Sequence, residues 1–210
     1  MENLPYDIDF DKYELPALDR TSDCETVFGK TNCRPEEYTY EELRTLNMGA
    51  KFADEKGNIP YAALHGAQVP EDLKILDLDT ILDYLESQAK SRYIIEIKNE
   101  GEVGRRGLDI LYQTVKERNL LDRVILGTFV EEVAKYKDEK YPDMMRGAYK
   151  KEVVDFYIAS LLGKKDYEAK FNALQIPFND LKEDTHVNVG TASVITDYPD
   201  MVYKIRETME

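Results

Sequence analysis

The chain has 210 residues, which is enough for one domain with a real core. Its 28 lysines and arginines against 42 acidic residues give a net charge of −14, so its surface repels nucleic acids and anionic membranes but not a divalent cation. No stretch approaches the ~20 apolar residues of a membrane span, and the first residues lack the pattern of a signal peptide, so we expect a cytoplasmic protein.

The N-terminal stretch is acidic, and its alternating aspartates invite a calcium-site interpretation. An EF-hand loop beginning at Asp7 would need glycine at its sixth position and glutamate at its twelfth, where the chain has Lys12 and Leu18. The alternation of Asp7 and Asp9 with apolar residues also suits a short edge strand with one acidic face. We expect an irregular acidic segment here.

The two cysteines, Cys24 and Cys33, lie in or beside a polar stretch, Asp19 to Asn32, that we expect to be a surface loop. No zinc-binding pattern surrounds them. They are close enough in sequence to form a small disulfide loop outside the cell, whereas a reducing cytoplasm favours free thiols. Free thiols are the state that we expect.

A short helix is predicted next, because Thr39 and Glu42 have the spacing of a capping box. Leu43 and Leu46 would then face inward. The loop that follows contains His65, which we interpret as a solvated loop histidine rather than a catalytic one.

The next helix is expected to begin after Asp77, whose side chain is suited to capping a helix N-terminus. Four apolar residues then recur at helical spacing and predict one stripe packed on a sheet: Leu78, Ile81, Leu82 and Leu85.

The segment from Tyr93 to Asn99 is apolar and β-branched, with one acid and one base at alternate positions, and it predicts a buried strand of a parallel sheet. Glu96 and Lys98 would emerge on the same face at the carboxyl end of this strand, which is where α/β folds carry their sites. Two interpretations stay open for them. They form a mutual ion pair, or Glu96 holds a divalent cation while Lys98 faces a phosphate.

Strands and helices alternate beyond this point, which argues for a parallel sheet or barrel. The helices carry inward-facing apolar residues and are expected over 108–119, 130–141 and 153–162, the last with Gly163 just past its end. Strands are expected at 124–129 and, with a weaker pattern around Arg146, at 144–149.

Four stretches together resemble the glycerophosphodiester phosphodiesterase (GDPD) family, from about Leu18 to Ile205. They are Leu18-Asp19-Arg20-Thr21, the Ile-Glu-Ile-Lys strand around Glu96, Ala173-Leu174-Gln175-Ile176-Pro177, and Ile195-Thr196-Asp197-Tyr198-Pro199-Asp200. The resemblance implies a single GDPD-like domain over 1–210 with a TIM-type (β/α) barrel. It further implies hydrolysis of glycerophosphodiesters to an alcohol and glycerol 3-phosphate with a divalent cation, Ca²⁺ or Mg²⁺. Glu96 would be a metal ligand, and Lys98 would bind the phosphate.

The chain departs from the family at both ends. The family uses two histidines as acid and base, yet Glu14-Leu15 occupies the place of its His-Asp pair, and nothing matches its first strand. Asp7 and Asp9 imitate its Glu-x-Asp metal pair, although too close to Leu18 for the family's spacing. The first strands are therefore expected to be missing or replaced, and Glu14 and His186 are the remaining candidates for proton transfer.

The carboxyl end is shortened too. Only 190–193 separates Val189 from Val194, too few residues to connect adjacent parallel strands, so we expect a hairpin or a single strand there. These departures predict an incomplete or open barrel, with the segment 7–11 or a second copy of the chain covering the exposed sheet edge.

The resemblance and the departures from it leave two possible functions. The chain is a metal-dependent phosphodiesterase, or it is a catalytically inactive remnant that acts as a binding module.

Overall fold

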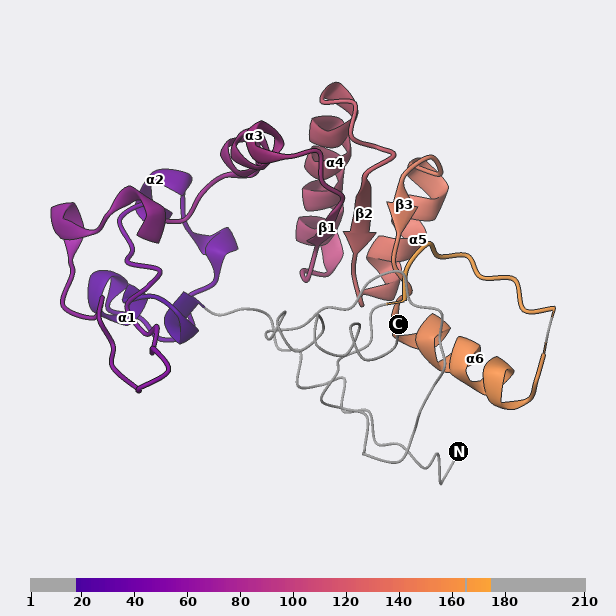
Figure 1. Cartoon of the computed structure of the whole chain (residues 1–210), viewed down its shortest axis with the longest axis horizontal. Coiled ribbons are helices and arrows are strands. Elements are labelled where there is room, and N and C mark those ends of the chain that lie inside the picture. Colours follow the sequence, from indigo (N-terminus) through magenta and orange to yellow (C-terminus); the bar gives the residue numbers. More distant parts are fainter. Residues whose placement is uncertain (1–17, 165, 175–210) are drawn as a thin grey trace. The chain divides into compact units, whose positions relative to one another are not determined.

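The computed structural model describes residues 18–164 and 166–174. Within them the chain divides into two compact units, 18–91 and 92–174. The first unit is built from short helices and turns, and the second alternates strands with longer helices (Figure 1).

The first unit contains three α-helices: α1 (Cys24–Phe28), α2 (Tyr40–Leu43) and α3 (Leu78–Gln88). Short 3-10 helices occupy Leu18–Arg20, Pro35–Glu37, Gly66–Gln68 and Glu71–Leu73. Its core gathers Leu18, Cys24, Cys33, Leu43 and Leu46, with Phe28, Tyr38, Met48 and Ile75 packed against them.

Two predicted helix starts in this unit are confirmed. The amide of Glu42 donates to the Thr39 hydroxyl at 3.3 Å, and the amide of Thr39 donates to the Glu42 carboxylate at 2.8 Å, which completes the capping box. Asp77 caps α3 by accepting the amide hydrogen of Thr80 at 2.7 Å.

Two expectations for the first unit are wrong. The stretch from Asp19 to Asn32 is not a plain surface loop, because it contains α1, and Ser22 and Cys24 within it are buried. The stripe on α3 is not packed as a whole, since Leu82 is buried whereas Ile81 and Leu85 are exposed. The described part of this unit contains no strand on which the stripe could pack.

The second unit follows the predicted alternation, and its six described helices and strands run in order along the chain. They are β1 (Tyr93–Glu96), α4 (Gly101–Glu117), β2 (Val124–Gly127), α5 (Glu131–Lys140), β3 (Met145–Arg146) and α6 (Lys150–Leu161), followed by a bridge at Ala173. The protein is thus a mixed α/β structure with a parallel sheet, and the three strands expected at 93–99, 124–129 and 144–149 are present in shortened form.

The strands lie side by side in the order β1-β2-β3, and all pairs are parallel. Glu96 lies opposite Gly127, and Leu126 lies opposite Arg146. Ala173 bridges Gly147 in parallel, so the next segment joins on the far side of β3. Each new strand is therefore added to the same edge of the sheet.

The core of this unit lies between α4, β2 and α5. Its fully buried side chains include Leu108 and Val115 of α4, Leu126 of β2 and Val133 of α5. Burying a side chain of this size stabilises a fold by about 1.5–3 kcal/mol. At the outer surface α4 and α5 are joined through Asp109, which accepts hydrogen bonds from Tyr136 and Tyr141 and pairs with Lys140 at 3.0 Å.

Burial differs from prediction at two places in this unit. Tyr93, Ile94 and Ile95 are only half-buried, because β1 is the end strand of the described sheet. Leu161 at the end of α6 is exposed. The end of α6 matches prediction, because Gly163 adopts a left-handed φ of 63° and Lys164 donates its amide hydrogen to the Ala159 carbonyl at 3.0 Å.

Candidate functional site

Glu96 and Lys98 meet at the carboxyl end of β1, as predicted from their alternation. Glu96 is the last residue of the strand, and the Ile97 amide continues the pairing by donating to the Gly127 carbonyl at 2.9 Å. The Lys98 ammonium lies 3.6 Å from the Glu96 carboxylate, and both side chains are about one-third exposed. The ion-pair interpretation is thus observed. An exposed pair of this kind contributes only about 0–1 kcal/mol, so little energy opposes its opening to a ligand.

The residues directly after the neighbouring strands carry no charge: Thr128 follows β2, and Gly147 and Ala148 follow β3. Thr128, just after β2, is buried, and its hydroxyl accepts the amide hydrogen of Val130 at 3.1 Å. Gly147 and Ala148, after β3, are buried as well. In the described ranges, no group of three or more His, Cys, Asp or Glu side chains could hold a metal ion. Glu96 alone does not fit a hard dication, which takes 6–8 oxygen ligands in the case of Ca²⁺.

The N-terminus of α4 lies close to this site in sequence, and it already holds an internal carboxylate. Glu132 of α5 accepts the amide hydrogen of Gly101, the first residue of α4. The same carboxylate lies 3.5 Å from the Arg105 guanidinium. A helix N-terminus favours negative charge, so Glu132 stabilises the α4–α5 arrangement.

The remaining sequence candidates fall elsewhere. Asp7, Asp9, Glu14 and His186 lie outside the described residues, as do the segments 190–193 and 195–200. His65 belongs to the first unit. Its side chain is 56% exposed, as predicted for a solvated loop, but its Nδ1 lies 3.2 Å from Oδ2 of Asp23.

The contact between His65 and Asp23 is part of a structural hydrogen-bond network. The carboxylate is buried, and its other oxygen accepts the Asn47 amide hydrogen at 2.8 Å. The Asn47 side chain in turn donates to the carbonyls of Tyr61 and Leu64. The network fixes the loops of the first unit.

Both cysteines are free thiols, as expected, and both are buried. Burial and a hydrogen bond with Cys33 raise the pKa of the Cys24 thiol to about 11. Because the thiolate is the reactive form, Cys24 is not a nucleophile at neutral pH.

The strongest charge cluster lies on β3 and was not predicted as a cluster. The Arg146 guanidinium is 1% exposed and contacts Asp138 of α5 at 2.7 Å and Glu152 of α6 at 2.6 Å. It also donates to the Gly147 carbonyl at 3.0 Å. The sequence showed only that Arg146 lies in a weakly predicted strand. Its two acidic partners come from two different helices, so their contact with Arg146 could not be predicted from local sequence.

Acid is expected to weaken this cluster. Burial alone would raise the pKa of Asp138, but the hydrogen bonds from Arg146 outweigh it and hold the pKa below the ordinary value of 3.8. A lowered carboxylate pKa contributes stability that is fully present above the unfolded value and is lost as pH falls through the folded value. We expect hydrogen exchange of the β3 and α5 amides to accelerate below about pH 3.8. An equal acid response in Asp138→Asn would contradict this assignment.

Comparison with known proteins adds no relative: no family model matches the chain, and no curated protein matches it. The resemblance to the GDPD family thus depends on the four sequence stretches and stays a prediction. In the described part of the chain, no helix is both long and apolar enough to span a membrane.

Proposed function

We propose that this chain is a phosphate-ester-binding protein built on an incomplete GDPD-like (β/α) barrel, which holds a glycerophosphodiester through Lys98 without hydrolysing it. The observation that carries this proposal is the exposed Glu96–Lys98 pair at the carboxyl end of β1. An ammonium there can leave its weak carboxylate partner for a phosphate, which it attracts as a point charge.

The strand order supports the barrel-like part of the proposal. Doubly wound sheets reverse the direction in which strands are added, and they bind ligands at that reversal. Here β1, β2, β3 and the Ala173 bridge follow one another along one edge of the sheet. Such sequential addition is the pattern of a (β/α) barrel, in which the carboxyl ends of the strands form the site.

Hydrolysis requires groups that the described site does not supply. A positioned general acid or base contributes about 10²–10⁴-fold in rate, and the only histidine of the described residues, His65, lies in the other unit, paired with Asp23. In the described part, Glu96 belongs to no group of three or more His, Cys, Asp or Glu side chains that could hold a metal ion. Binding is therefore favoured over turnover, and metal-dependent hydrolysis is the second candidate function.

Titration calorimetry with glycerophosphocholine tests the proposal on the full chain. We expect weak binding that declines with salt, because a partly exposed charge is screened. Lys98→Met is expected to weaken it about tenfold or more, the effect of losing a charge-assisted hydrogen bond. Lys151→Met is the matched control, since Lys151 is also an exposed, ion-paired lysine but belongs to α6.

Two outcomes would contradict the proposal. Binding that persists unchanged in Lys98→Met would remove the assigned phosphate ligand. Robust metal-dependent hydrolysis that Glu96→Ala abolishes would replace the binding function with the enzymatic one.

A further inference from the structure

A pocket of ≈ 530 Å³ opens beside the amino-terminal end of β3, whereas Glu96 and Lys98 lie at the carboxyl end of β1. Its walls come from the end of α5, from the turn before β3 and from the segment before Ala173. Its lining includes Lys137, Asp138, Asp143, Met144, Lys170 and Asn172. Asp143 and Met144 directly precede β3, so the pocket lies at the amino-terminal edge of the parallel strands. Its volume is in the range of about 300–1,000 Å³ that small-molecule sites occupy.

The pocket contains an under-coordinated buried charge. Lys137 is 5% exposed, and its ammonium has one hydrogen-bond partner in the described part of the chain, Asp138 Oδ1 at 3.3 Å. That carboxylate is shared with Arg146, whose Nε and Nη2 lie 2.7–3.1 Å from its two oxygens. An ammonium carries three donor hydrogens, and a buried charge is costly unless it is paired. Lys137 therefore has donor capacity that residues 18–164 and 166–174 do not use.

Further donors stand at the same pocket. Lys170 is exposed at its rim, as is Asn172. The side-chain oxygen of Asn172 accepts the Arg146 amide hydrogen at 3.1 Å, which leaves its NH₂ group as a donor. Two ammonium groups and one amide at a single pocket suit an oxyanion.

The pocket also presents a carboxylate. Asp143 is exposed, and among the described residues it accepts one hydroxyl, that of Tyr112, at 3.0 and 3.2 Å from its two oxygens. A carboxylate has about four acceptor positions, so Asp143 can take further donors. The buried Met144 adds an apolar wall between the charged groups.

We infer that this pocket binds a small zwitterion, with its oxyanion held by Lys137 and Lys170 and its ammonium group held by Asp143. The site is separate from Lys98, because the two lie at opposite ends of the parallel strands. Each charge of such a ligand thus has a partner of opposite sign in the pocket.

The full chain is titrated calorimetrically with O-phosphoethanolamine, which carries both charges, and with inorganic phosphate and ethylamine, which carry one each. We expect saturable binding of O-phosphoethanolamine, at least about tenfold tighter than that of either single-charge probe. Lys137→Met and Lys170→Met are each expected to weaken it about tenfold. Asp143→Asn is expected to reduce its affinity to that of inorganic phosphate.

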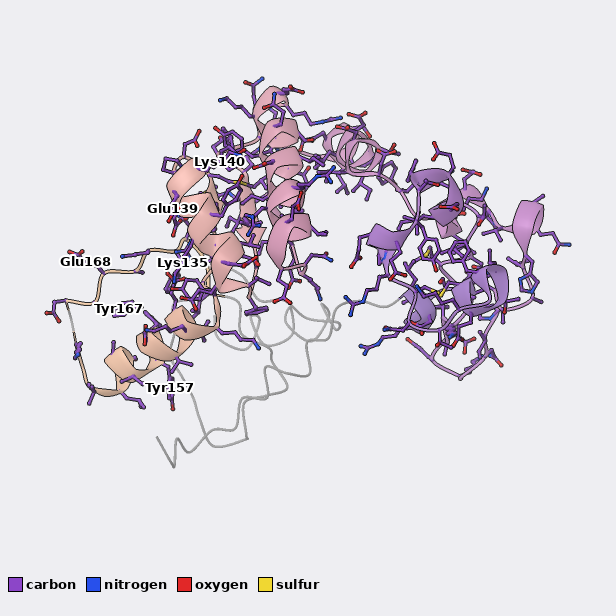
Figure 2. All side chains as sticks on the ribbon, turned by 180° about the vertical axis from the view of Figure 1, so that it is seen from behind. Lys135, Glu139, Lys140, Tyr157, Tyr167 and Glu168 are labelled. Atoms are coloured by element: carbon purple, nitrogen blue, oxygen red, sulfur yellow. The ribbon has the colours of Figure 1, made fainter. Side chains whose placement is uncertain are left out.

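Lys135→Met is the matched control, because Lys135 lies two residues from Lys137 on α5, but its side chain is exposed (Figure 2). It pairs with Glu131 at 2.7 Å, and its loss should leave binding unchanged. Lys98→Met should also leave binding unchanged, which distinguishes this site from the proposed function. Lys170 is exposed, so its variant tests the site even if Lys137→Met impairs folding.

Three results would overturn the inference. The first is no saturable binding of O-phosphoethanolamine by the folded wild-type chain. The second is binding that survives both lysine variants or is lost in Lys98→Met. The third is an Asp143→Asn variant with unchanged preference for O-phosphoethanolamine over inorganic phosphate, which would remove the ammonium half of the site.

Discussion

Replacing Arg146 with methionine is expected to destabilise the second unit by about 3–5 kcal/mol, the usual cost of removing one partner from a buried ion pair. Glu152 is buried, and among the described residues its ion-pair partner is Arg146, so the substitution leaves its charge uncompensated there. The same substitution removes hydrogen bonds to Asp138 of α5 and to the Gly147 carbonyl. One side chain thus joins β3 to two helices, and all three elements should loosen together.

Hydrogen exchange measures this effect best, because it reports on each amide separately. The chain divides into two compact units, and a single melting curve would combine the unfolding of both units. Amides of β3, α5 and α6 should lose protection together, whereas those of the first unit should not. Arg105→Met is the matched control, since Arg105 pairs with Glu132 at 3.5 Å with both side chains over 40% exposed. It should cost no more than about 1 kcal/mol.

A double variant separates charge from packing. Adding Glu152→Gln to Arg146→Met removes the uncompensated buried charge, so it should recover part of the lost stability. The glutamine keeps an oxygen that can accept the Tyr149 amide hydrogen at the start of α6. If Arg146→Met behaves like Arg105→Met, or if the double variant is less stable than the single one, the ion pair does not hold these elements together.

The elements of the second unit could be predicted from sequence because local periodicity specifies them. Leu108, Leu111 and Val115 recur at helical spacing, and the structure buries all three on α4. The alternation that placed Glu96 and Lys98 on one face follows from strand geometry alone, and their contact at 3.6 Å confirms it. For these residues the local pattern and the structure agree.

The unpredicted features depend on residues far apart in the chain. Asp23 contacts His65, which is 42 positions away in sequence, and it accepts the amide hydrogen of Asn47. Asp23 and Asn47 are buried, although Asp23 belongs to a stretch whose polar composition predicts a surface loop. Arg146 reaches eight residues back to Asp138 and six forward to Glu152, each on a different helix. Composition shows that such groups exist, but only the fold decides which of them meet.

Gly104 is a further residue whose role sequence periodicity did not reveal, although three glycines at a spacing of three mark the start of α4: Gly101, Gly104 and Gly107. A Cβ atom at Gly104 would lie 2.1 Å from the Asn99 carbonyl oxygen and 2.9 Å from Cγ2 of Val133. The missing side chain therefore lets both the loop after β1 and helix α5 approach α4.

Gly104→Ala is expected to destabilise the second unit by about 1–3 kcal/mol, the range for inserting a methyl group into a packed core. Gly107→Ala is the matched control in the same helix. Its Cβ would meet only Ile97 Cδ1, at 3.9 Å, so the higher helix propensity of alanine should stabilise the chain by about 0.5–1 kcal/mol. The two substitutions thus have opposite expected signs, and hydrogen exchange of the α4 amides measures both.

The Gly104 substitution should also affect the proposed phosphate site, because Asn99, whose carbonyl must move, directly follows Lys98. We expect Gly104→Ala to weaken glycerophosphocholine binding under conditions in which the unit is still folded, and Gly107→Ala to leave it unchanged. Equal binding by both variants would mean that the position of Lys98 does not depend on the close contact between α4 and the β1 loop. Equal stability of both would mean that the loop and Val133 move aside at no cost, and that Gly104 is not required for packing.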